Sequence, residues 1–270
     1  MELILHLPHS SVHFPHRKGF LINETQCLKE AEHLGDLYTE ELFYPKKQQA
    51  KYRAVVAGFS RVFCDAERYE DDEKEIMSRF GLGATYTHND DGKEIRKISA
   101  ELREEILSEY YRPHHKKLER YVDEGLAGNQ EVLIVDCHSF PHIPFHKSII
   151  PDSKERRPDI CIGTDSFHTS EKLTQFVEVF FKQKGYSVSV NSPYSGSMVT
   201  SKHHRSSRKL STIMVEVNRR LYMDERTKYK LTHNGEFQSM QDDLQQLLSG
   251  LKNFNEKKIK YEVGNIRTIW

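Results

Sequence analysis

The stretch Val132-Leu133-Ile134-Val135-Asp136-Cys137-His138-Ser139 carries the strongest structural signal in this chain. An unbroken run of four aliphatic residues is typical of a strand that is covered on both faces. The run then ends in an acid, a thiol, an imidazole and a hydroxyl. Because Asp136 and His138 would be costly to bury without partners, we expect them at the carboxyl end of the strand, where open α/β sheets bind ligands.

A similar pattern occurs at the start of the chain. The apolar run Leu3-Ile4-Leu5-His6-Leu7 is followed directly by Pro8-His9-Ser10-Ser11. A single histidine at the end of a strand is most simply a structural residue. Two such strands, if parallel, would bring His9 and His138 together at one edge of the sheet. This pairing favours a metal site.

Strands and helices alternate along the rest of the chain. Further strands are predicted at 54–58, 159–163, 186–190 and 212–219, and helices at 23–32, 36–43, 99–125, 170–184 and 236–250. Val62-Phe63-Cys64 is also strand-like, and Pro113 predicts a kink or a restart in the longest helix. The pattern predicts one α/β domain over residues 1–270, a three-layer α/β/α sandwich with a central mixed, mostly parallel sheet.

Composition excludes several classes of protein. Lys+Arg and Asp+Glu are balanced at 40 each, so no overall charge indicates a nucleic-acid partner. No apolar run approaches the length of a membrane span, and the N-terminus lacks the pattern of a secretory signal. Four widely spaced cysteines without a CxxC pair predict reduced thiols in a cytoplasmic protein. The short basic segment 202–208 lacks interleaved aromatics, and we interpret it as part of a loop over a site for small acidic substrates.

Two further carboxylates need a structural or a functional explanation. Glu216 lies in the apolar stretch 212–219, where a carboxylate needs either a partner or a function. A salt bridge with Arg219 or Arg220 is the structural alternative. Asp36, in the first turn of its predicted helix, either complements the helix dipole or contributes a ligand.

Arg61 and Arg68 flank the strand-like Val62-Phe63-Cys64, and buried guanidinium groups need anionic partners. Together with the two imidazoles and Glu216, they suggest hydrolysis at a zinc ion. Catalytic zinc takes three N or O ligands from the protein. A nearby glutamate can move the proton of the attacking water, and arginines can polarise a carbonyl or grip a carboxylate. A GxSxG motif, the mark of a serine nucleophile in α/β-hydrolases, is absent.

Six short blocks, in this order, resemble the N-formylglutamate amidohydrolase family over roughly residues 3–225. They are Pro8-His9-Ser10, Ser60-Arg61 with Asp65-Ala66-Glu67-Arg68, Tyr111-Arg112-Pro113-His114-His115, Asp136-Cys137-His138-Ser139, Pro158-Asp159-Ile160-Cys161-Ile162-Gly163 and Glu216-Val217-Asn218-Arg219. That family is related in fold to the zinc carboxypeptidases and aspartoacylases. The resemblance implies a zinc-dependent hydrolase of an amide bond next to a carboxylate, such as that of N-formylglutamate.

The resemblance also assigns roles by matching position. His9, Asp36 and His138 correspond to the ligands of one zinc ion, and Glu216 corresponds to the general base and acid. The remaining roles fall on arginines and an asparagine: Arg61 in catalysis, and Arg68, Asn218 and Arg219 in substrate binding.

Two blocks depart from the family's usual pattern. Glu67-Arg68 stands where Asn-Arg is usual, and Ser195-Gly196-Ser197 lacks the usual paired glycines. Both departures concern the substrate rather than the metal. Two alternative functions remain open at this point: a zinc carboxypeptidase that acts on a peptide end, and a catalytically silent binding domain of the same fold.

Overall fold

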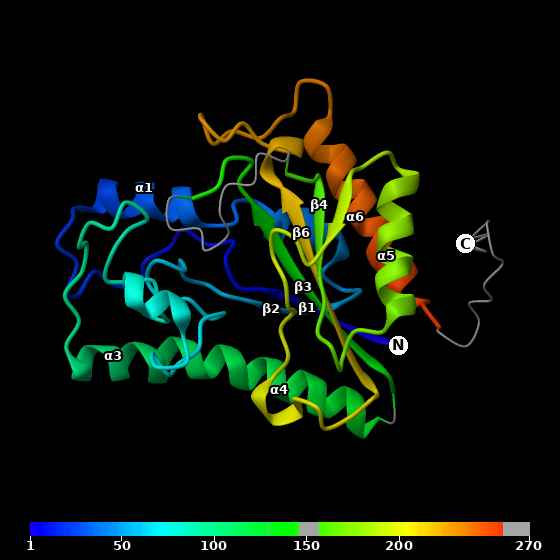
Figure 1. Ribbon diagram of the computed structural model, residues 1–270, viewed down its shortest axis with the longest axis horizontal. Coiled ribbons are helices and arrows are strands. Elements are labelled where there is room, and N and C mark those ends of the chain that lie inside the picture. The colour runs from blue at the N-terminus through cyan, green and yellow to red at the C-terminus, as the bar shows by residue number, and fades with distance from the viewer. Residues whose placement is uncertain (129, 146–156, 256–270) are drawn as a thin grey trace.

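The computed structural model describes residues 1–128, 130–145 and 157–255. Six strands form one sheet in the order β2-β1-β3-β6-β4-β5 (Figure 1). Their bounds are β1 Glu2–Leu7, β2 Arg53–Val56, β3 Val132–Phe140, β4 Ile160–Gly163, β5 Val188–Val190 and β6 Leu210–Asn218. β4 runs antiparallel to β6, and the other neighbouring pairs are parallel. The prediction of a mixed, mostly parallel sheet is confirmed.

Helices cover both faces of this sheet (Figure 1). The α-helices are α1 Glu24–Leu34, α2 Thr39–Phe43, α3 Ala100–Ile106, α4 Arg112–Ala127, α5 Glu171–Gln183 and α6 Glu236–Lys252. α4 packs against β1, β2 and β3 on one face, whereas α2 and α6 contact β1, and α5 contacts β4 and β5, on the other. The expected three-layer α/β/α sandwich is therefore confirmed.

The central strand β3 decides how the site is oriented. Every residue of β3 is buried, and burial of each large aliphatic side chain contributes about 1.5–3 kcal/mol. Val132 and Ile134 belong to the cluster beneath α4, whereas Leu133 and Val135 belong to the cluster on the opposite face. Because side chains alternate along a strand, the α4 face continues toward the carboxyl end with acidic and imidazole side chains.

The segment Val62-Phe63-Cys64 is not a strand, which corrects the prediction. It forms turns in which the carbonyl of Ser60 accepts hydrogen bonds from the amides of Phe63 and Cys64 at 2.9 and 3.0 Å. The three side chains are fully buried, so their apolar character reflects burial in a turn rather than a strand. Their amides are satisfied within the turn and do not depend on a sheet ladder.

Two helix predictions also need adjustment. The helix predicted from Asp36 is α2, which begins only at Thr39 after Tyr38 takes a left-handed φ of 67°. Asp36 therefore lies outside the helix, and dipole complementation does not explain it. In the longest helical stretch a π-helical turn, Leu107–Tyr111, separates α3 from α4, with Pro113 in the first turn of α4. The predicted interruption is thus confirmed, and proline explains it because it cannot donate to the preceding turn.

Two other expectations concern the whole chain. Among the described residues, no helix combines the length and the hydropathy that crossing a membrane requires. The four cysteines, Cys27, Cys64, Cys137 and Cys161, are buried and free of disulfide bonds.

Candidate metal centre

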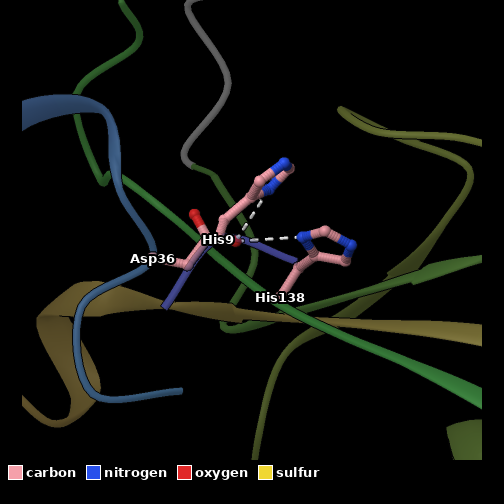
Figure 2. A group of neighbouring side chains, drawn as sticks. All are labelled: His9, Asp36 and His138. Carbon is pink, nitrogen blue, oxygen red and sulfur yellow. Dashed lines mark hydrogen bonds and ion pairs between the residues drawn. The ribbon is translucent and has the colours of Figure 1, made fainter. Parts of the chain in front are cut away.

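Three side chains from separate parts of the chain converge at the carboxyl ends of β1 and β3 (Figure 2). His9 lies two residues beyond β1, and His138 is the seventh residue of β3. Asp36 follows Gly35, whose amide ends α1 by bonding to Ala31. The backbone amide of Asp36 donates to the carbonyl of His9 at 2.9 Å, which ties the two loops together.

The potential ligand atoms of His9, Asp36 and His138 all lie within 4.8 Å of one another. Asp36 Oδ2 is 2.9 Å from His138 Nδ1 and 3.5 Å from His9 Nδ1. His9 Nδ1 is buried and has no hydrogen-bond partner. A buried imidazole nitrogen without a partner is costly, whereas two imidazole nitrogens and a carboxylate oxygen are a common protein ligand set for catalytic zinc. The donor set therefore fits a zinc ion.

Each imidazole is held by a carboxylate on its far side. His9 Nε2 is 2.8 Å from Asp65 Oδ1, and His138 Nε2 is 3.0 Å from Asp136 Oδ1. With the proton on Nε2, both Nδ1 atoms face Asp36 with their lone pairs available. Carboxylate–histidine pairs of this kind fix the tautomer and orientation of metal-binding histidines.

The third candidate ligand has an equivalent support. Arg219 Nη2 donates to Asp36 Oδ1 at 3.2 Å, and the same guanidinium donates to Ser139 Oγ and to the carbonyl of His33. Arg219 is only 1% exposed. These contacts use three of the five N–H donors of Arg219, and the substrate-binding role that we predicted for it stays a prediction.

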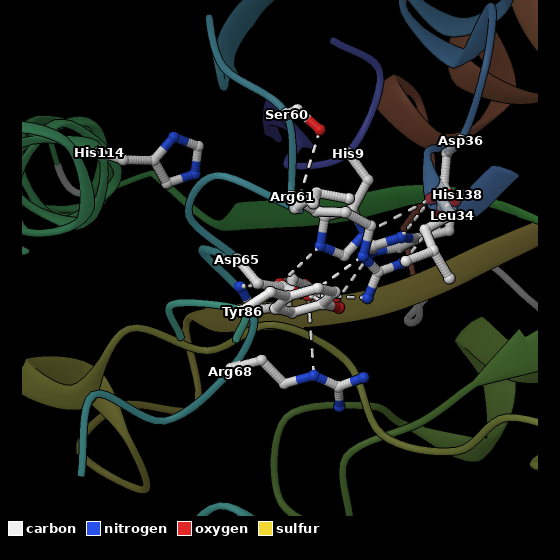
Figure 3. Close-up of polar contacts among 12 residues, drawn as sticks. His9, Leu34, Asp36, Ser60, Arg61, Asp65, Arg68, Tyr86, His114 and His138 are labelled. Carbon is white, nitrogen blue, oxygen red and sulfur yellow. Dashed lines mark hydrogen bonds and ion pairs between the residues drawn. The ribbon is translucent and has the colours of Figure 1, made fainter. Parts of the chain in front are cut away.

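Asp65 is the centre of the network around His9 (Figure 3). Besides His9, its carboxylate accepts from Arg61 Nε and Nη2 at 3.1 and 2.8 Å and from the Tyr86 hydroxyl at 2.8 Å. Burial alone would raise the pKa of Asp65, but Arg61 and His9 hold it well below the usual range. The anion that we predicted for Arg61 is thus a residue of the same segment, and a role for Arg61 on the substrate carbonyl remains a prediction.

Arg68 is less firmly held. Its Nε lies 3.7 Å from Asp65 Oδ2, its Nη1 lies 3.8 Å from Glu75 Oε1, and its Nε has no hydrogen-bond partner. Its donors are therefore available for a further acceptor. Glu67, the departure noted in the sequence, points back to the sheet, with Oε2 3.2 Å from His138 Nε2.

A second group of potential ligand atoms comprises His6, Glu67 and Asp136. His6 Nδ1 is 2.8 Å from Asp136 Oδ1, and His6 Nε2 is 2.9 Å from His114 Nε2 in α4. Both ring nitrogens of His6 therefore have partners without an ion. This group connects the metal centre to α4, a connection that the sequence analysis did not predict.

Glu216 lies beside the centre because of the strand register. His138 of β3 is directly opposite Glu216 of the parallel strand β6. Glu216 is 7% exposed, and its Oε2 has no hydrogen-bond partner. The alternative of a salt bridge is not seen among the described residues, because Arg219 and Arg220 pair with aspartates.

The protonation of this region follows from burial and from neighbouring charges. Burial raises the pKa of Glu216 to about 7; His138 opposes this shift, and the carboxylates of Asp36 and Glu67 add to it. Burial would lower the pKa of His138, but Glu67 and the other nearby carboxylates raise it well above its ordinary value. A carboxyl group that titrates near neutral pH is suited to both accepting and donating a proton.

Arg157 and Tyr194, near Glu216, were not identified from the sequence. Arg157 donates to the Tyr194 hydroxyl at 3.3 Å, and its guanidinium carbon lies 5.6 Å from the centroid of the Tyr194 ring. Asn218, for which substrate binding stays a prediction, donates from Nδ2 to the carbonyl of Pro158 at 2.9 Å and is fully buried. The available sequence signal for Arg157 was its position directly before the block that begins at Pro158.

Comparison with known proteins agrees with this geometry. The sequence profile of the N-formylglutamate amidohydrolase family matches residues 1–223. The chain belongs to this family. It is 25% identical over 235 residues to the N-formylglutamate deformylase of Pseudomonas putida, a match that covers 83% of each protein. The family assignment confirms the resemblance drawn from the six sequence blocks and makes the chain a member of a family of amide hydrolases.

Solved structures show the same fold. The N-formylglutamate amidohydrolase of Ralstonia eutropha JMP134 superposes with a TM-score of 0.76 at 23% identity, covering 95% of both chains. A gene product of Agrobacterium tumefaciens superposes with a TM-score of 0.62 at 18% identity, covering 93% of this chain and 92% of that one.

Proposed function

We propose that the protein is a metal-dependent hydrolase that cleaves the amide bond of an N-acyl amino acid, with one zinc ion held by His9, Asp36 and His138. The observation that carries this proposal is the buried Nδ1 of His9, which has no hydrogen-bond partner and lies 3.5 Å from Asp36 Oδ2, the same oxygen that contacts His138 Nδ1. When bound there, zinc supplies Lewis acidity, which activates water at neutral pH and polarises a carbonyl oxygen.

Glu216 is the proton carrier in this proposal. Its carboxylate takes a proton from the water as the water oxygen attacks the acyl carbon. As the carbon–nitrogen bond breaks, Glu216 delivers that proton to the leaving amine, so an N-formyl substrate gives formate and a free amino acid. Its burial and the pKa of about 7 make both transfers accessible near neutral pH.

The arginines divide into positioning and binding roles. Arg219 positions Asp36, and Arg61 positions Asp65, which in turn orients His9. Arg68, whose guanidinium has unused donors, binds the carboxylate next to the scissile amide. In an N-acyl amino acid this is the α-carboxylate, one carbon away from the amide nitrogen.

N-formylglutamate is the substrate that we propose, because the matched relative from Pseudomonas putida is an N-formylglutamate deformylase. Partners are thus small acidic molecules. The four free, buried cysteines agree with a reducing compartment, and we place the protein in the cytoplasm.

The decisive experiment combines metal analysis with a substrate screen. Protein purified without added metal is analysed for its metal content, and the zinc-loaded protein is assayed with N-formyl, N-acetyl and dipeptide substrates by detection of the free amine. We expect about one zinc ion per chain and release of amino acid from N-formylglutamate. Hydrolysis of dipeptides alone would support the carboxypeptidase alternative, and metal binding without any hydrolysis would support a silent binding domain.

A further inference from the structure

Arg157 is a partly buried cation whose described contacts are all with neutral groups. Its Nη1 donates to the carbonyl of Pro141 at 3.0 Å and to the Tyr194 hydroxyl at 3.3 Å. Its guanidinium carbon lies 5.7 Å from the ring centroid of Phe140 and 5.6 Å from that of Tyr194. Among the described residues, no carboxylate lies within the 4.0 Å that defines an ion pair with Arg157.

The neighbouring arginines differ in this respect. Each of them has an acidic partner: Arg61 pairs with Asp65, Arg219 with Asp36, and Arg220 with Asp159. A partly buried guanidinium gains most from an anion, because its charge is screened less than at an exposed site. Arg157 therefore has the unused capacity to bind one.

Strand pairing places this cation beside the catalytic region. Cys161 of β4 is directly opposite Glu216 of β6, so the two side chains share a face of the sheet. Cys161 Sγ donates to the main-chain carbonyl of Tyr194 at 3.2 Å, which holds Tyr194 next to Glu216. Burial raises the pKa of Tyr194, and the Glu216 carboxylate contributes to this rise.

The chain on either side of this cation is also fixed. Asn218, two residues beyond Glu216 in β6, holds the carbonyl of Pro158 at 2.9 Å, and Pro158 directly follows Arg157. The next residue, Asp159, pairs with Arg220. These two contacts, one to β6 and one to the 3₁₀ turn Arg219–Leu221 that follows it, position the backbone from which the Arg157 side chain extends.

We propose that Arg157 and Tyr194 form a subsite that binds the side-chain carboxylate of the substrate and so selects dicarboxylic N-acyl amino acids. This inference rests on the proposed hydrolase function and deepens it. The Tyr194 hydroxyl accepts its bond from Arg157, which leaves its own proton for a carboxylate oxygen. One guanidinium and one phenol can then donate to the same carboxylate.

The two arginines contact different parts of the site. Arg68 contacts Asp65, the direct partner of His9, and is suited to the α-carboxylate next to the amide. Arg157 contacts Tyr194, which Cys161 holds beside the strand that carries Glu216, and is suited to the second carboxylate. A substrate with two carboxylates would satisfy both arginines.

The test compares N-formyl-L-glutamate with N-formyl-L-glutamine, which has nearly the same shape but lacks the second charge. With zinc-loaded native protein, kcat/KM should favour the glutamate substrate. In Arg157→Gln, kcat/KM should fall about 10- to 100-fold for N-formyl-L-glutamate, the effect of losing a charged hydrogen bond, and change little for N-formyl-L-glutamine. The ratio of kcat/KM for N-formyl-L-glutamate to that for N-formyl-L-glutamine should fall less in Tyr194→Phe than in Arg157→Gln. Arg157→Lys should retain part of the native ratio.

Arg208→Gln is the matched control. Arg208 also lies over an aromatic ring, 3.7 Å from the centroid of Phe167, and donates to a main-chain carbonyl at 3.0 Å. It lies two residues before β6 begins, at the opposite end of that strand from Glu216. The structure thus places the basic segment 202–208, whose Lys202 pairs with Asp123 of α4, away from the metal centre, which corrects its interpretation as a loop over the substrate site. This variant should leave the ratio unchanged.

Binding gives a second measurement that does not depend on turnover. In a Glu216→Gln background, adding Arg157→Gln should weaken the calorimetric affinity for N-formyl-L-glutamate to the same extent as it lowers kcat/KM. An unchanged affinity, or an equal loss for both substrates, would overturn the subsite. If native protein hydrolyses neither substrate, the proposed function fails, while the affinity comparison still decides whether the subsite exists.

Discussion

His138 and Glu216 lie directly opposite each other on the neighbouring parallel strands β3 and β6, both facing the layer that contains α4. One is a candidate metal ligand and the other the candidate proton carrier. Their proximity therefore comes from backbone hydrogen bonding between two buried strands and needs no mobile loop. A one-residue slip of β6 would turn Glu216 to the opposite face, so the apolar residues that fix the register also assemble the site.

Replacing Glu216 by Gln tests the proton carrier. Gln keeps the size and the hydrogen bonding of the side chain but cannot take up a proton. We expect zinc to stay bound at about one ion per chain, while kcat falls about 10²- to 10⁴-fold. Metal analysis and single-turnover kinetics on the same sample measure both quantities. Unchanged turnover would rule out this mechanism.

Replacing His9 or His138 by Asn tests the metal centre. Either change removes one of the three proposed ligands. Loss of a residue that only supports a ligand typically lowers metal affinity about 10- to 100-fold, so loss of a ligand itself should lower zinc affinity at least about 100-fold. Competition with a chromophoric chelator measures this affinity. His203→Asn is a suitable control, because His203 also pairs with an aspartate, Asp123 at 3.0 Å, but lies outside the centre. A native level of zinc in both ligand variants would refute the assignment.

Asp65→Asn tests the support of His9. The amide can no longer hold the Nε2 proton as a carboxylate does, and it leaves Arg61 without its ion pair. We expect zinc affinity to fall about 10- to 100-fold, and the metal-bound form to lose the corresponding stability in addition to any loss in the metal-free form. If zinc affinity remains native while stability falls, Asp65 serves the fold alone.

The raised pKa of Glu216 predicts a pH-dependent stability of the metal-free protein. Because the folded-state pKa of about 7 exceeds the ordinary value of 4.5, this group contributes stability below pH 4.5 that is lost as the pH rises through 7. Metal-free Glu216→Gln should therefore gain stability relative to native protein between pH 4.5 and about pH 8, on the order of 3 kcal/mol. Urea unfolding at the two pH values measures the gain, and a constant difference between the proteins would contradict it.

Glu67→Gln tests the effect of the sequence departure next to Arg68. The Glu67 carboxylate lies 3.2 Å from His138 Nε2, beside the centre at which we propose that an anionic substrate binds. Removing its charge should raise kcat/KM for N-formyl-L-glutamate by about 3- to 10-fold, since a like charge several ångströms away costs roughly 1 kcal/mol in a partly screened site. Glu73→Gln, at an exposed acid, is the control. A lower kcat/KM in Glu67→Gln would show that this carboxylate assists binding instead.

Much of the sheet could be predicted from local sequence. Unbroken aliphatic runs indicated β1 and β3, and Asn23 indicated the start of α1, where its side chain does form a capping box with Gln26. The pattern failed at Val62-Phe63-Cys64, because periodicity reports burial and not the direction of backbone hydrogen bonds. It failed in the same way at Asp36, where local propensity suggested a helix that the left-handed Tyr38 delays.

The roles of the arginines needed the structure. An arginine in an apolar stretch of sequence indicates that an anion will contact it. It does not indicate whether that anion is a substrate or a residue of the protein. For Arg61 it is Asp65, four residues away, and for Arg219 it is Asp36. Arg157 stands directly before one of the six sequence blocks, but its significance lies in having no acidic partner among the described residues, which only the structure shows.

The sequence by itself determined that His9 follows one buried apolar run, that His138 lies at the end of a second and that Glu216 lies within a third, because the hydrophobic effect forces such runs into the core. It could not determine which strands are neighbours, since strand order depends on how the connecting helices pack. Only the tertiary structure decided that β1, β3 and β6 are adjacent. That adjacency brings two imidazoles and a glutamate from distant parts of the chain to one edge of the sheet, where a site can form.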